Sequence, residues 1–80
     1  MRLDKYLKVS RVIKRRTVAN DACDAGRVLI NDKPAKSATT VKIGDIIEIR
    51  FGEKTTKLEV LAINEIVRKE DADKMYRYLT

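Results

Sequence analysis

The spacing of apolar residues predicts two helices at the start of the chain. Leu3, Tyr6 and Leu7 follow the i, i+3, i+4 spacing of an amphipathic helix. A second helix is predicted to begin at Thr17, which we expect to act as its N-cap, and to end at Gly26, a residue suited to the position after a helix. The side chains expected to face the core from this helix are small, so another element can pack close to it: Val18, Ala19, Ala22, Cys23 and Ala25.

After residue 26 the period of the apolar residues changes from 3.6 to 2, which predicts strands. Residues 28–30, 47–51 and 58–62 are apolar or alternate between apolar and polar. The pairs Asn31-Asp32, Gly44-Asp45 and Gly52-Glu53 mark turns between these segments. Pro34 favours an edge strand or a loop after the first of them. The middle of the chain is therefore predicted to form a small antiparallel sheet.

Near the end of the chain the helical period returns. Ala72, Met75, Tyr76 and Leu79 fall at i, i+3, i+4 and i+7, which predicts a C-terminal helix. The sequence thus predicts an α+β fold in which two N-terminal helices pack on a small antiparallel sheet. We place the main domain at residues 1–66 and expect residues 67–80 to form a C-terminal helix packed on it or extending it.

The positive charge of the chain is concentrated at its start. The net charge is +6, and the first 20 residues hold seven Lys and Arg against a single acid, Asp4. Such an arrangement is typical of a surface that binds a polyanion. Lys14, Arg15 and Arg16 directly precede the predicted cap Thr17, where the helix dipole disfavours cations. We expect these arginines, the Thr17 hydroxyl and the backbone N–H groups of the helix start to bind a phosphate.

The residue types argue against an enzyme. The chain of 80 residues has no His, and its one cysteine, Cys23, lies in the stripe of small residues on the second predicted helix. Its three glycines punctuate predicted elements and form no phosphate-binding loop. We therefore predict a non-enzymatic protein without a metal or cofactor. A single cysteine, no apolar run long enough to span a membrane and no signal peptide predict a cytoplasmic location.

Three kinds of anionic partner fit a basic N-terminus. A helix pair followed by a sheet is compatible with a winged helix-turn-helix protein that binds DNA. The second predicted helix, however, carries Asn20, Asp21 and Asp24 as its polar residues, and two acids would repel a duplex. A basic amphipathic helix can also lie on a membrane, but its apolar residues are needed here for the core. Recognition of an RNA backbone fits best, and we predict no membrane partner.

The pattern of residues in the first 50 positions resembles a known family. "RLDKYLKVSRVIKRRTVANDACDAGRVLIN" followed by "VKIGDIIEI" is similar to the S4 RNA-binding domain, also called the alpha-L RNA-binding motif. The resemblance implies that residues of the basic segment face rRNA and the tRNA backbone. Together with the charge pattern it gives the following predicted RNA-binding residues: Arg2, Lys5, Lys8, Arg11, Lys14, Arg15, Arg16 and Thr17.

Among such domains, the chain is most similar to the stand-alone RqcP-like proteins, a bacterial group related to heat shock protein 15. The resemblance rests on length, on Arg50, Phe51, Gly52 and Lys54, and on the closing Met75-Tyr76. It implies a monomer that binds large-subunit (23S) rRNA of the 50S subunit and peptidyl-tRNA. There it would act as a brace while RqcH adds alanine tails to stalled chains. A free-standing rRNA-binding assembly factor and a small DNA-binding regulator are the alternatives.

Overall fold

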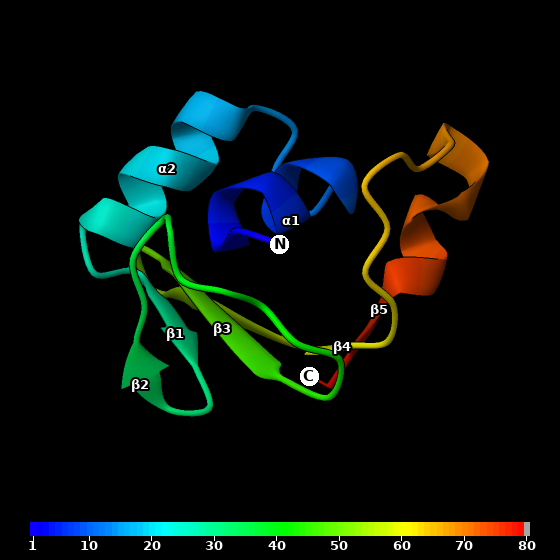
Figure 1. The fold of residues 1–80 in the computed structure, drawn as a ribbon. Coiled ribbons are helices and arrows are strands. Elements are labelled where there is room, and N and C mark those ends of the chain that lie inside the picture. The colour runs from blue at the N-terminus through cyan, green and yellow to red at the C-terminus, as the bar shows by residue number, and fades with distance from the viewer. Residues whose placement is uncertain (80) are drawn as a thin grey trace.

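A five-stranded antiparallel sheet, in the order β2-β1-β3-β4-β5, carries two helices on one of its faces (Figure 1). The computed structural model describes residues 1–79. The α+β fold predicted from the sequence is confirmed. The elements are α1 (Leu3–Val9), α2 (Arg16–Asp24), β1 (Val28–Ile30), β2 (Lys33–Pro34), β3 (Ile46–Phe51), β4 (Lys54–Val60), a 3₁₀ helix η1 (Lys69–Met75) and β5 (Tyr76–Tyr78).

The core lies between the helices and one face of the sheet. The predicted apolar stripe of α1, formed by Leu3, Tyr6 and Leu7, is fully buried. The strands contribute the alternate residues of β3 and β4 that face α1 and α2. The core cluster thus includes Ile47, Ile49, Leu58, Val60, Ala19, Ala22 and Cys23. Burial of this face fixes which side chains of the N-terminal segment remain on the surface.

The start of α2 differs from the prediction. The helix begins at Arg16, its N-cap residue is Arg15 in an extended conformation, and no side chain caps it. The prediction that Thr17 is the cap is therefore wrong. Arg16 stands in the first turn, from which its side chain reaches the carboxylate of Asp4 on α1. Val18, expected in the core, is 42% exposed, because the face of α2 that packs on the sheet is set by Ala19, Ala22 and Cys23.

The end of α2 matches the prediction. Gly26 has a φ of 78°, and its N–H donates to the carbonyl of Cys23. The N–H of Arg27 donates to the carbonyl of Ala22, which completes a Schellman motif. Ala25, which we expected in the core, is exposed at this turn. The turn directs the chain into β1.

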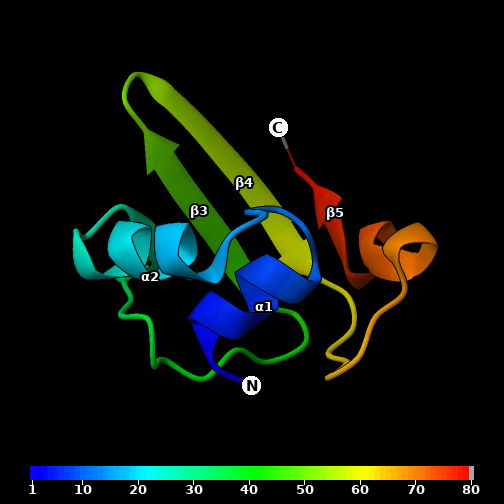
Figure 2. The same cartoon turned by 90° about the horizontal axis from the view of Figure 1, so that it is seen from above.

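The predicted turns between strands are also confirmed. Asn31 and Asp32 both have a positive φ, 52° and 69°, and connect β1 to β2 as a two-residue hairpin loop. Pro34 lies on β2, at the edge of the sheet, as expected. Gly52 and Glu53 join β3 to β4, and this hairpin projects well beyond the two helices (Figure 2).

The C-terminal segment is helical over a shorter range than predicted. Ala72 and Met75 are buried on the 3₁₀ helix η1, as expected, but the helix ends at Met75. Tyr76 instead begins β5, which pairs antiparallel with residues 58–60 of β4. Leu79 is 41% exposed, contrary to the predicted stripe. The open edge of β4 offers backbone partners that a local period cannot reveal.

The division of the chain at residues 66 and 67 stays a prediction. Residue 80, which belonged to the predicted C-terminal helix, lies outside the described residues. No helix within residues 1–79 has the length and apolar character needed to cross a membrane.

Candidate nucleic-acid interface

A buried carboxylate organises the N-terminal cations. Asp4 is 1% exposed and stands in the first turn of α1, where its Oδ1 accepts the backbone N–H of Lys5 at 2.8 Å. Arg2 donates from Nε to Oδ1 and from Nη2 to Oδ2, both at 3.2 Å. The Asn20 amide on α2 donates to Oδ2 at 3.3 Å, and Nε of Arg16 lies 3.6 Å from the same oxygen. We call Asp4, Arg2, Arg16 and Asn20 the Asp4 cluster.

The two arginines of this cluster come from different elements. Arg2 immediately precedes α1, and Arg16 is the first residue of α2. Their side chains are 50% and 51% exposed, whereas the carboxylate between them is buried. Each guanidinium therefore has one side against Asp4 and presents further N–H groups to solvent. Two such forks near each other form a surface suited to phosphate oxygens.

The Asp4 carboxylate is held in its charged form. Burial alone would raise the pKa of Asp4. The hydrogen bonds from Asn20 and from the N–H of Lys5, together with the charges of Arg16 and Arg2, outweigh burial and place this pKa below its ordinary value of 3.8. At neutral pH the cluster therefore contains one anion and two cations.

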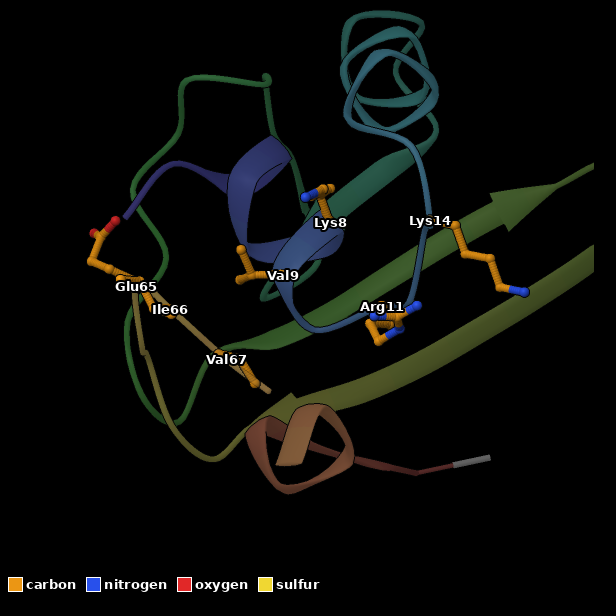
Figure 3. A pocket seen from close by; sticks show the side chains of 7 residues that line it. All are labelled: Lys8, Val9, Arg11, Lys14, Glu65, Ile66 and Val67. Atoms are coloured by element: carbon orange, nitrogen blue, oxygen red, sulfur yellow. The ribbon is translucent and has the colours of Figure 1, made fainter. Parts of the chain in front are cut away.

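A second part of the basic segment lines a groove about 380 Å³ in volume (Figure 3). Lys8 and Val9 of α1, with Arg11 and Lys14 of the following turn, form one wall. Residues 65–67 form the other. Arg11 has a positive φ of 64°, so the chain turns sharply there. Beside the groove, Lys5 forms an ion pair with Glu65, which ties α1 to the opposite wall and keeps the pKa of Glu65 below its usual value through hydrogen bonding and charge.

The predicted RNA-binding residues are thus divided between two places. Arg2 and Arg16 meet at Asp4, while Lys8, Arg11 and Lys14 line the groove. Lys5 is engaged by Glu65, and Arg15 is exposed at the start of α2. Thr17 is exposed beside Arg16 on a smaller groove of about 320 Å³ that also includes Asp4, Asn20 and Asp21.

The sequence did not indicate Asp4 and Asn20 as members of the site. Asp4 is the one acid among the first 20 residues, and its position among seven cations was the available signal. Asn20 lies one helical turn after Arg16, on the same face of α2. The contact between α1 and α2 that unites these residues is tertiary, so no local pattern contains it.

The cations on the outer face of the sheet have acidic neighbours. Glu48 accepts a hydrogen bond of 2.6 Å from Arg50 and lies 3.5 Å from Lys57. Arg77 on β5 pairs with Glu59 on β4 at 2.7 Å. These pairs neutralise that face, so it is less suited to a polyanion than the N-terminal surface. Within residues 1–79, His, Cys, Asp and Glu side chains form no group of three or more that could hold a metal.

Comparison with known proteins agrees with this geometry. Residues 1–47, which include α1, α2, β1 and β2, match the S4 domain family. The chain belongs to the S4 domain family. Among curated S4-type relatives, it is 53% identical over 76 residues to the RQC P-site tRNA stabilizing factor of Halalkalibacterium halodurans, covering 95% of this chain and 86% of that protein.

The protein of the same name from Streptococcus pneumoniae is 52% identical over 80 residues, covering 100% of this chain and 91% of the relative. These identities place the chain in the RqcP group of S4-domain proteins. Its fold matches a solved structure described as trimeric Vibrio cholerae heat shock protein 15, with a TM-score of 0.89 at 32% identity. That match covers 98% of this chain and 80% of the other.

Proposed function

We propose that this chain is an RNA-binding brace on the ribosome. It binds 23S rRNA of the large subunit and peptidyl-tRNA, and it supports RqcH-dependent alanine tailing of stalled nascent chains. The observation that carries the proposal is the pair of half-exposed arginines, Arg2 and Arg16, held around the buried carboxylate of Asp4. Relatives named P-site tRNA stabilizing factors support the tRNA part of the proposal.

The properties of α2 support RNA over duplex DNA as the ligand. Reading base edges in a major groove requires side chains such as Arg, Asn or Gln on the exposed face of a helix. The amide of Asn20 donates to Asp4, and the exposed acids Asp21 and Asp24 would repel a duplex. The cations stand instead at the start of α2 and along α1, where they suit the shape and backbone of folded RNA.

The proposed mechanism involves no bond making. Phosphate contacts position a protein on nucleic acid without reading its sequence. A small rigid domain that contacts both rRNA and tRNA holds the tRNA in one position on the subunit. RqcH would then meet a peptidyl-tRNA whose location is constant from one alanine addition to the next.

Fractionation of cell extracts tests the proposal against its alternatives. We expect the protein to co-sediment with mature 50S subunits that carry peptidyl-tRNA, and to do so as a monomer before binding. Sedimentation with precursor subunits alone would support an assembly factor, and sedimentation with the nucleoid would support a DNA-binding regulator. Loss of alanine tails on deletion of the protein, with RqcH still present, would separate the tailing role from rRNA binding alone.

A further inference from the structure

We propose that Asp4 is a positioning residue for RNA binding. Its buried carboxylate holds Arg2 and Arg16 together, so that the two guanidinium groups meet the RNA backbone as one preformed unit. This inference rests on the proposed RNA binding and goes beyond it by assigning a role to an acid within a basic surface.

Contacts from three parts of the chain fix the carboxylate. The N–H of Lys5 binds Oδ1 at 2.8 Å and anchors it to α1. The amide of Asn20 binds Oδ2 at 3.3 Å and links it to α2. Arg2 binds both oxygens from the segment before α1. Rotation of the carboxylate would break several of these contacts at once, so its orientation is set by the fold and not by a ligand.

The arginines keep donors available while they are held. A guanidinium has five N–H groups, and Arg2 uses two of them on Asp4. Arg16 approaches Asp4 through Nε, and half of its side chain remains exposed. Ordering a long side chain at an interface costs free energy, and a side chain that is already ordered avoids much of that cost. Asp4 thus prepares both arginines before RNA arrives.

Charge and positioning make opposite predictions for the removal of Asp4. A carboxylate next to a phosphate site repels the ligand, so charge alone predicts tighter RNA binding when it is neutralised. Loss of positioning predicts weaker binding, because both arginines would then be free to adopt many rotamers. The direction of the change therefore separates the two effects.

The variant Asp4→Asn tests the inference, with binding to purified 50S subunits and to structured RNA measured at low and moderate salt. Asn retains the shape and an oxygen that can accept the N–H of Lys5, but it loses the charge that holds two arginines. We expect affinity to fall about tenfold in the wild-type background, and less than about twofold when Arg2 and Arg16 are both Ala, because groups that act together are not additive. Asp21→Asn, the same charge change at an exposed acid of the same groove, is the matched control and should bind as wild type or more tightly.

Unchanged or tighter binding by Asp4→Asn would overturn the inference, as would an equal loss in both backgrounds. If Asp4→Asn does not fold, Asn20→Ala provides a second test, because it removes one support of Oδ2 without changing the net charge. We expect it to weaken binding about threefold, by the same loss of pre-organisation, and normal binding would overturn the inference. Failure of the wild-type protein to bind RNA would instead reject the proposed function.

Discussion

The hydroxyl of Tyr6 donates a hydrogen bond of 2.7 Å to the backbone carbonyl of Met75, which lies 69 positions later in the chain. Tyr6 is fully buried, and the bond joins α1 to the end of η1 just before β5 begins. The same carbonyl accepts the N–H groups of Leu61 and Ala62. One tyrosine thus connects the N-terminal helix to the segment that completes the sheet. Burial, and to a smaller degree the charge of Tyr76, raises the pKa of Tyr6 well above 10, so the hydroxyl remains a donor.

We expect Tyr6→Phe to lower the free energy of unfolding by about 0.5–1.5 kcal/mol, the usual net value of one hydrogen bond. A value near the lower end is expected, because the Met75 carbonyl keeps two backbone donors. Urea denaturation measures the change, with Tyr78→Phe, a half-exposed tyrosine, as the control. A Tyr6→Phe protein as stable as wild type would show that the bond contributes nothing.

Arg16→Ala should weaken binding to the 50S subunit about tenfold or more, because a charge-assisted contact to phosphate contributes roughly 1.5–3 kcal/mol. Its stability should change by no more than about 1 kcal/mol, since a half-exposed ion pair contributes little and removing a cation relieves the helix start. Arg16→Lys should restore only part of the affinity, as an ammonium lacks the planar fork. Lys33→Ala, an exposed cation on β2, is the control for charge. Normal binding together with a much lower melting temperature would make Arg16 a structural residue.

The salt dependence of RNA binding should be steep. If about five N-terminal cations contact phosphates, the logarithm of the affinity should fall with the logarithm of the salt concentration at a slope of roughly −3 to −5. Filter binding or anisotropy across a series of KCl concentrations gives this slope directly. A slope near zero would rule out electrostatic anchoring by the basic segment.

Cys23 should be chemically inert in the folded protein. Its thiol is buried on α2 as predicted, and burial, with the nearby charges of Asp4 and Asp24, raises its pKa to about 11. A polar thiol reagent should therefore label it only on unfolding. Cys23→Ala should cost about 1 kcal/mol or less and leave RNA binding intact. Rapid labelling of the native protein would contradict the buried position.

Acid should remove a contribution of Asp4 to stability. Because its pKa is lower in the folded than in the unfolded chain, Asp4 stabilises the protein above about pH 4. This contribution is lost as the pH falls through the folded pKa. Unfolding free energies of wild type and Asp4→Asn, measured from pH 7 down to pH 2, should differ most at neutral pH and converge in acid. A constant difference would mean that the Asp4 charge does not stabilise the fold.

The helices and strands with a strong local period were predictable from the sequence. Leu3, Tyr6 and Leu7 form the buried stripe of α1, and Asn31-Asp32 forms a hairpin turn with a positive φ at both residues. These features depend on neighbours within a few positions, and the sequence contains that information.

Features that depend on distant partners were not predictable in the same way. The boundary of α2 at Arg16 rather than Thr17 goes with a contact to Asp4, twelve positions earlier. The strand at Tyr76 exists because β4 has an open edge, although the same residues also fit a helical period. The predicted cations of the site were read from composition, whereas the acid that gathers two of them is visible only in three dimensions.

The antiparallel pairing of β4 with β5 also has a consequence for the order of folding. During synthesis, α1 and α2 leave the ribosome long before residues 76–78, so the sheet lacks an edge strand and Tyr6 lacks its acceptor at Met75. Contacts that span almost the whole chain have a high contact order and form late. The surface of α1 that carries the binding cations therefore becomes rigid only when the last strand arrives. A nascent chain halted before residue 75 would remain sensitive to proteases.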